Sequence, residues 1–109
     1  QRLCRSRGCC WSPHGHAGPP WCFFSTRHGY RVSRVRNTPD GLEVSLSRLP
    51  APSLFGNDVG SVRLRVQFQT HNRLRLQFSD PKSRRFEVPH EHVGPFAGSA
   101  SEPGYDVEI

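Results

Sequence analysis

The chain has 109 residues, which is enough for one ordinary domain or for a small module followed by part of another. Its net charge of +6 comes from 14 arginines and one lysine against nine acids. The arginines are spread along the chain with acids among them, so we expect no nucleic-acid partner. These interspersed acids are Asp40, Glu43, Asp58, Asp80, Glu87 and Glu91. No apolar run approaches the ~18 residues that a membrane-spanning helix needs.

The two ends of the sequence show neither a start signal nor a natural stop. The chain contains no methionine, and its N-terminus lacks the charged and apolar regions of a signal peptide. Residues 105–109 alternate like a strand up to the last residue. We therefore expect the sequence to be part of a longer protein, cut through structure at both ends.

The first 26 residues are loop-like and contain every cysteine of the chain, together with His14 and His16. The cysteines are Cys4, Cys9, Cys10 and Cys22. Zinc sites usually space their ligands as Cys-x2–4-Cys and His-x3–5-His, and neither the adjacent cysteines nor the two histidines fit. The spacing favours a disulfide framework over a zinc site, with free thiols as a third alternative. Disulfides indicate an oxidising compartment: secreted, lumenal or at the outer cell surface.

From about Tyr30 the sequence changes to an alternation of period two, which indicates half-buried strands. Leu42, Val44 and Leu46 alternate with polar residues in this way. Residues 53–60 predict a loop in which Asn and Gly take left-handed backbone conformations.

Residues 62–68 and 74–78 predict an antiparallel hairpin. Its apolar residues share one face only if three cross-strand pairs form, namely Leu64 with Phe78, Val66 with Leu76, and Phe68 with Leu74. Thr70, His71 and Asn72 are then a three-residue loop, with Asn72 in the left-handed position. The apolar residues form the buried face, and the outer face carries Arg63, Arg65, Arg73 and Arg75.

The remaining sequence predicts short strands and no long helix. Asp80-Pro81 ends the second strand of the hairpin, because proline cannot donate to a sheet. Phe86 and Val88 predict a further short strand that Pro89 stops. Ten prolines and ten glycines argue against long helices. The predicted fold is mostly β, with antiparallel strands arranged as in a sandwich.

Two sets of motifs resemble known families. The vicinal Cys9-Cys10 after a glycine, with the later Pro20-Trp21-Cys22-Phe23, resembles the second half of a P-type trefoil, a small loop-rich module with three disulfides. A longer series of motifs resembles the glycoside hydrolases of family 31, of the maltase-glucoamylase and sucrase-isomaltase type. This series covers nearly the whole chain and comprises Trp21-Cys22-Phe23-Phe24, His28-Gly29-Tyr30, Leu54-Phe55-Gly56-Asn57-Asp58, Asn72-Arg73, Asp80-Pro81 and Arg84-Arg85-Phe86-Glu87-Val88-Pro89.

The resemblance implies two parts. Residues 1–26 correspond to a partial P-type trefoil held by a disulfide, and residues 27–109 to the first part of an N-terminal β-sandwich of the galactose-mutarotase type, an incomplete domain. The trefoil pairing scheme implies a Cys4–Cys22 disulfide, with the partners of Cys9 and Cys10 upstream of residue 1. The family's catalytic (β/α)8 barrel and its two aspartates lie outside the sequence. No catalytic residue is therefore implied here, and whether the chain is itself an enzyme stays open.

The residues themselves offer few alternative sites. Asp40 and Asp80 are explained as turn formers and Asp58 as a loop cap, rather than as the paired carboxylates of glycoside hydrolysis. Trp11 and Trp21 are candidate carbohydrate contacts, and the alternative is that they cover the disulfides of a module without a proper core. We expect no metal and no cofactor.

The resemblance implies the non-catalytic N-terminal portion of a retaining α-glucosidase that hydrolyses α-linked oligosaccharides derived from maltose, starch or sucrose. The oligosaccharide substrate would bind to the catalytic barrel. An anchor upstream of this sequence would hold the parent protein at the membrane. The implied place is the extracellular face of the plasma membrane, at the brush border, or the secretory lumen, ahead of the lysosome. The alternative is a stand-alone module that binds carbohydrate through the trefoil or a polyanion through the four arginines of the hairpin.

Overall fold

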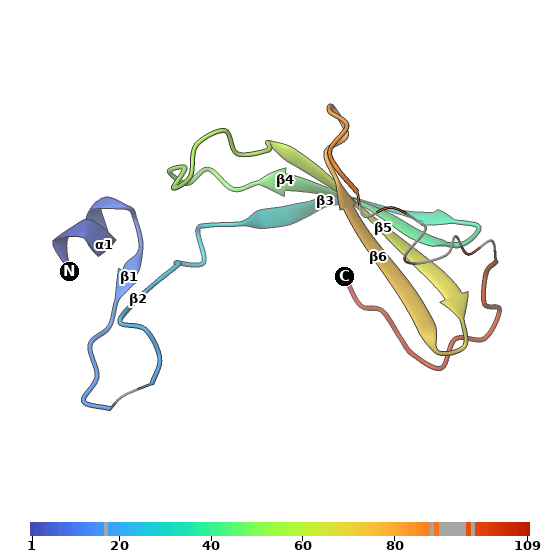
Figure 1. Ribbon diagram of the computed structural model, residues 1–109, viewed down its shortest axis with the longest axis horizontal. Coiled ribbons are helices and arrows are strands. Elements are labelled where there is room, and N and C mark those ends of the chain that lie inside the picture. The colour runs from blue at the N-terminus through green and yellow to red at the C-terminus, as the bar shows by residue number, and fades with distance from the viewer. Residues whose placement is uncertain (17, 88, 90–95, 97) are drawn as a thin grey trace. The chain divides into compact units, whose positions relative to one another are not determined.

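The computed structural model describes residues 1–16, 18–87, 89, 96 and 98–109. Within them the chain is mostly β, as predicted, with antiparallel strands and one short helix (Figure 1). The elements are α1 (Arg2–Ser6), β1 (Cys10–Trp11), β2 (Cys22–Phe23), β3 (Tyr30–Thr38), β4 (Gly41–Arg48), β5 (Ser61–Thr70) and β6 (Arg73–Ser79). No helix among the described residues is long and apolar enough to cross a membrane. The chain divides into two compact units, residues 1–31 with 48–58 and residues 32–47 with 59–109.

The first unit is held by a disulfide between Cys4 and Cys22, whose Cα atoms are 5.9 Å apart. Cys4 is buried inside α1, and Cys22 begins β2, which pairs antiparallel with β1. The helix departs from the loop predicted here, because five residues are too few to show a helical period in the sequence. It ends where Gly8 takes a left-handed φ of 73°. Closing a loop of this size stabilises the folded chain by roughly 3 kcal/mol in the chain-entropy description.

Residues 48–58 form a loop that completes the first unit. The Leu49 N–H donates to the carbonyl of Gly29, and the Arg48 guanidinium forms an ion pair with Asp58 at 2.8 Å. Gly56 and Asn57 have φ values of 75° and 51°, which confirms the left-handed conformations predicted for this loop.

The second unit is a four-stranded sheet in the order β3-β4-β5-β6. Its core lies on one face, where Val44 of β4 is paired with Leu64 of β5, and Val66 lies beside them. Val44 and Val66 have no exposed surface. The period-two pattern therefore positions a small apolar cluster at the centre of the sheet.

The hairpin of β5 and β6 has the predicted register: the three pairs Leu64 with Phe78, Val66 with Leu76 and Phe68 with Leu74 all form. The predicted three-residue loop is wrong. Thr70 pairs with Arg73, and the ladder is irregular between Phe68 and Thr70. Asn72 is not among the described residues with positive φ. The extra residue is accommodated as a bulge within β5, so the turn itself needs no left-handed residue.

The predicted burial of the hairpin's apolar face holds for β5 and fails for β6. Leu74, Leu76 and Phe78 are 37%, 53% and 63% exposed. The physical reason is that β6 is an edge strand of the sheet. Partly buried Val107 packs against the central cluster, which lies on β4 and β5.

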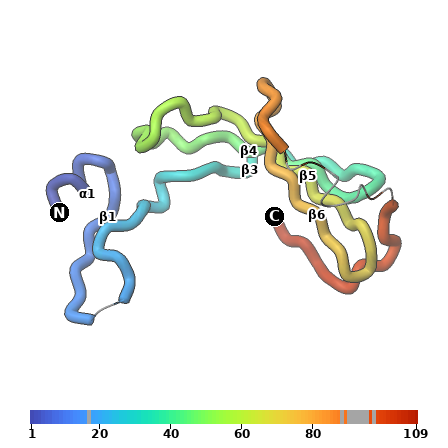
Figure 2. The backbone as a smooth tube through the Cα atoms, in the orientation of Figure 1, coloured from blue at the N-terminus to red at the C-terminus, as the bar shows by residue number. Residues whose placement is uncertain are grey.

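The C-terminal segment runs beside the end of the β5–β6 hairpin (Figures 1 and 2). The Ala100 N–H donates to the carbonyl of Phe68, and the Tyr105 ring packs on the Phe68 ring, with centroids 6.0 Å apart. The Tyr105 hydroxyl lies 2.8 Å from the carbonyl oxygen of Arg73. Residues 105–109 are not a strand, contrary to the prediction, because the segment is held by these contacts rather than by a ladder.

The strand predicted at Phe86 and Val88 is also not observed where the structure describes it. Phe86 is in an irregular segment and is 87% exposed. Val88 lies outside the described residues. Asp80 and Pro81 do end β6 as predicted.

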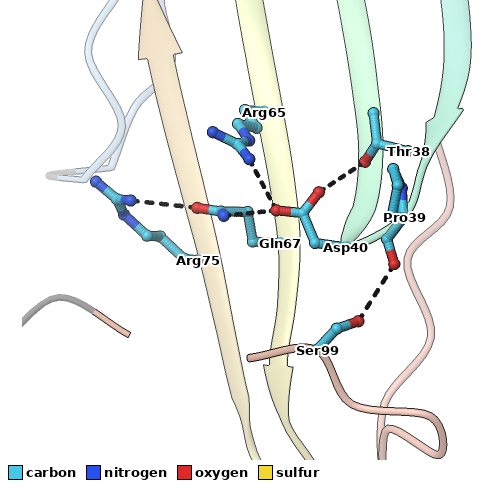
Figure 3. A network of polar contacts seen from close by, with 7 residues as sticks. All are labelled: Thr38, Pro39, Asp40, Arg65, Gln67, Arg75 and Ser99. Atoms are coloured by element: carbon cyan, nitrogen blue, oxygen red, sulfur yellow. Dashed lines mark hydrogen bonds and ion pairs between the residues drawn. The ribbon is translucent and has the colours of Figure 1, made fainter. Parts of the chain in front are cut away.

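One carboxylate connects the β3–β4 turn to β5 (Figure 3). Asp40 Oδ2 accepts from Gln67 Nε2 and from an Arg65 Nη, both at 2.8 Å, and Oδ1 accepts from the Thr38 hydroxyl at 2.9 Å. Gln67 Oε1 in turn accepts from Arg75, which extends the network to β6. The next residue, Gly41, approaches β5 so closely that a Cβ on it would overlap the carbonyl oxygen of Val66.

Val66→Asp should destabilise the protein by about 3–5 kcal/mol, because it places an unpaired charge in the apolar cluster. Urea denaturation followed by circular dichroism measures the change. The matched control is Arg63→Ser on the opposite face, where the side chain is 49% exposed; its effect should stay within about 0.5 kcal/mol. Equal effects of the two variants would contradict the observed register.

Asp40 should make the stability of the second unit depend on pH in the acid range. Hydrogen bonds from Gln67 and Thr38, with Arg65, hold the pKa of the Asp40 carboxyl below its ordinary value, against a smaller effect of desolvation. The stabilisation is thus complete above the unfolded pKa, about 4, and is lost as pH falls through the lower folded pKa.

Asp40→Asn should therefore flatten the loss of stability below about pH 4. The measurement is the urea midpoint between pH 2 and pH 7, with Asp106→Asn, an exposed aspartate, as the control. A variant with the wild-type acid profile would show that the network does not depend on the charge of Asp40.

Candidate functional site

The carboxylates that could serve glycoside hydrolysis are engaged in structural contacts. Asp40 is held by the network described above. Asp58 pairs with Arg48, and Asp80 accepts from the Lys82 N–H and lies 3.4 Å from an Arg85 Nη. Asp40 lies in the β3–β4 turn and Asp80 in the turn after β6, as expected from the sequence, whereas Asp58, expected as a loop cap, forms an ion pair.

The arginines of the β5–β6 hairpin do not form a free basic face. Arg65 pairs with Asp40, and Arg63 lies 3.9 Å from Glu43, which also pairs with Arg36 of β3 at 2.9 Å. Arg75 donates to Gln67, and Arg73 lies 5.5 Å from the centroid of the Phe96 ring. The sequence did not reveal these pairings, since Asp40 and Glu43 reach the arginines only through the β4–β5 register.

The two tryptophans lie together in the first unit. Their rings meet edge to face, with centroids 5.8 Å apart and an angle of 89° between the planes. Trp21 is 46% exposed, whereas Trp11 is half-buried. Trp21 is therefore the more accessible of the two indoles, and the edge-to-face contact with Trp11 supports it from the side.

The first unit contains two cavities that share Phe24, Leu54 and Phe55. The larger, about 590 Å³, is lined mainly by apolar groups and by the Cys4–Cys22 disulfide; its other lining residues include Leu3, Arg7, Trp11, Pro20 and Phe23. The smaller, about 330 Å³, is lined by His28, Tyr30, Arg48 and Asp58 among others.

His28 is the polar group of this region that sequence reasoning missed. Its Nδ1 lies 3.1 Å from the Ser25 hydroxyl, and its Nε2 is buried without a hydrogen-bond partner among the described residues. Its ring is tilted against Phe24, with centroids 5.6 Å apart. The motif His28-Gly29-Tyr30 marked the position, but nothing in its spacing indicated a buried nitrogen.

Cys9 and Cys10 form no disulfide and are both half-buried. The described part of the chain contains no group of three or more His, Cys, Asp or Glu residues arranged to hold a metal.

Comparisons with known proteins agree with the two sets of motifs. The family model of the Trefoil (P-type) domain matches residues 1–25. The intestinal sucrase-isomaltase of Homo sapiens is 47% identical over 108 residues, which covers 98% of this chain and 6% of that protein. Probable maltase-glucoamylase 2 of Homo sapiens is 42% identical over 104 residues, or 93% of this chain and 4% of that protein. Lysosomal alpha-glucosidase of Rattus norvegicus is 37% identical over 116 residues, or all of this chain and 12% of that protein.

The chain thus spans about 6% of the length of the sucrase-isomaltases that it matches, and its matches cover nearly all of its own residues. The trefoil model falls on the segment that contains α1, β1, β2 and the disulfide. The chain belongs to the family of the sucrase-isomaltases, maltase-glucoamylases and lysosomal α-glucosidases, glycoside hydrolase family 31, within which it corresponds to a trefoil-containing segment.

Proposed function

We propose that the chain is the non-catalytic trefoil-and-sheet portion of an α-glucosidase that hydrolyses α-linked oligosaccharides. The observation that carries the proposal is that nearly the whole chain matches sucrase-isomaltase and lysosomal alpha-glucosidase, while Asp40, Asp58 and Asp80 are held in structural contacts. A retaining glycosidase needs two carboxyl groups about 5–5.5 Å apart, and one of them acts as an acid whose pKa is raised. The Asp40 carboxylate instead accepts hydrogen bonds from Gln67, Thr38 and Arg65 of the sheet. Asp58 and Asp80 are likewise paired with arginines.

In this proposal the chain is a scaffold for the enzyme and takes no part in the chemical reaction. Residues 1–26 are the trefoil, and residues 27–109 are the first part of a β-sandwich of the galactose-mutarotase type that braces a catalytic barrel. The exposed apolar residues of β6 support this role, because they offer a surface for further structure to cover. The oligosaccharide would be bound by the barrel, without a cofactor and without nucleic acid.

The proposed place is the extracellular face of the plasma membrane or the secretory lumen, with an anchor outside this sequence. The Cys4–Cys22 disulfide supports an oxidising compartment. The relatives include intestinal and lysosomal proteins, and we favour the cell surface because the identity to the intestinal proteins is higher.

A hybrid enzyme tests the scaffold role. In it, the matching 108 residues of human sucrase-isomaltase are replaced by this chain. We expect the hybrid to reach the cell surface and to hydrolyse sucrose and maltose, since the chain supplies only a scaffold. Val66→Asp in the hybrid should abolish its appearance at the cell surface, and Arg63→Ser should leave the surface amount and kcat/KM within about twofold of the hybrid.

The chain alone should not hydrolyse a chromogenic α-glucoside above a buffer control. Asp40→Asn, Asp58→Asn and Asp80→Asn serve as comparisons in the same assay. Turnover by the wild-type chain that one of these substitutions abolishes would overturn the non-catalytic role.

A second candidate role is carbohydrate contact through Trp21, which the exposure of its indole favours. Trp21→Ala should remove the shifts that maltose causes in the indole N–H signals of the NMR spectrum, whereas Trp21→Phe should keep part of the binding, because it preserves an aromatic face. Unchanged shifts in Trp21→Ala would assign the disulfide-covering role to both tryptophans.

A further inference from the structure

The positive charge of the chain is concentrated in one of its two units. The first unit contains six arginines and one acid, a net charge of +5 out of the chain's +6. The arginines are Arg2, Arg5, Arg7, Arg27, Arg31 and Arg48. The second unit carries the remaining +1, because its basic residues are nearly balanced by acids.

Most of this charge is not compensated within the unit. Its one acid, Asp58, pairs with Arg48. The other five arginines are exposed, and in the part of the chain that the structure describes none of their side chains forms an ion pair or a side-chain hydrogen bond. The contrast with the β5–β6 hairpin is direct, because there each of Arg63, Arg65 and Arg75 has a partner.

The same unit has an open apolar groove, the cavity of about 590 Å³. Arg7 lines it, together with Leu3, Phe23 and Phe55, which are 63%, 44% and 87% exposed. Arg2 and Arg5 belong to the same short helix as Leu3. A ligand in this groove would therefore meet exposed aromatic faces and, close by, guanidinium groups without partners.

We propose that this surface binds an anionic glycan, a chain of sugars that bears sulfate or carboxylate groups. Sugar rings have apolar faces that pack on aromatic side chains, and their anionic substituents accept paired hydrogen bonds from guanidinium groups. Charge complementarity decides the class of partner, since a neutral glycan would leave Arg2, Arg5 and Arg7 unused.

The compartment favours a glycan over an anionic lipid as the partner. The disulfide indicates an oxidising environment outside the cytosol. Anionic lipids are concentrated in the cytoplasmic leaflet, on the other side of the membrane. Sulfated and carboxylated glycans belong to the outer side, where this unit would meet them. The proposal does not rest on the α-glucosidase function, since it requires only the first unit's surface.

Heparin is the probe, and the full chain is the protein to use. The wild-type chain should bind heparin with an affinity that falls steeply with added NaCl, and it should not bind neutral dextran. The triple variant Arg2→Gln/Arg5→Gln/Arg7→Gln should weaken binding by at least about tenfold, because it removes charged donors from the helix and the groove.

The matched control removes the same charge from the second unit. Arg34, Lys82 and Arg84 are exposed there, and their replacement by Gln should change the affinity for heparin by less than about twofold. Phe55→Ala changes no charge and should weaken heparin binding while leaving its dependence on salt unaltered. Circular dichroism of each variant confirms that the fold is retained.

Three results would overturn the proposal: equal loss of affinity in the two triple variants, no effect of Phe55→Ala, or tighter binding to phosphatidylserine vesicles than to heparin. The first would mean that only the overall charge matters, the second that the groove is not used, and the third that the partner is a membrane. Failure of these tests would leave the α-glucosidase proposal untouched, because the hybrid enzyme is assayed on neutral sugars.

Discussion

The pairing register of β5 is the constraint on which the second unit depends. A strand alternates its side chains between two faces, so one register positions Leu64 and Val66 in the core and sends Arg63 and Arg65 to the other side. A shift by one residue would bury arginines and expose the core. The apolar cluster and the ion pairs of Asp40 and Glu43 are therefore two consequences of the same geometry.

The sequence predicted this register because two short segments with clean alternation leave only one way to keep the apolar residues together. It also predicted the turn at Asp80 and the left-handed residues at Gly56 and Asn57. Each of these features is decided within a few residues of the chain, by steric preferences that belong to the residue types themselves.

The features that the sequence missed depend on partners distant along the chain. Nothing near Asn72 shows that a bulge in β5 absorbs the extra residue. Tyr105 reads as part of a strand, yet its position is decided by the Phe68 ring and the Arg73 carbonyl. Among the candidate sites, the pairing of Arg65 with Asp40 spans 25 residues, and the orphaned His28 Nε2 depends on how loops pack.

The bulge between Phe68 and Thr70 has a consequence for how the hairpin tolerates change. The extra residue lies in β5 rather than at the turn. The cross-strand pairs from Arg63–Ser79 to Phe68–Leu74 therefore do not depend on the backbone conformation of His71 and Asn72. An insertion or deletion near the turn can be absorbed by creating or removing the bulge. Val66 and Leu64 then stay on the core face of the sheet. The tip of the hairpin can thus diverge in length and sequence, and meet different neighbours, while the core keeps its register.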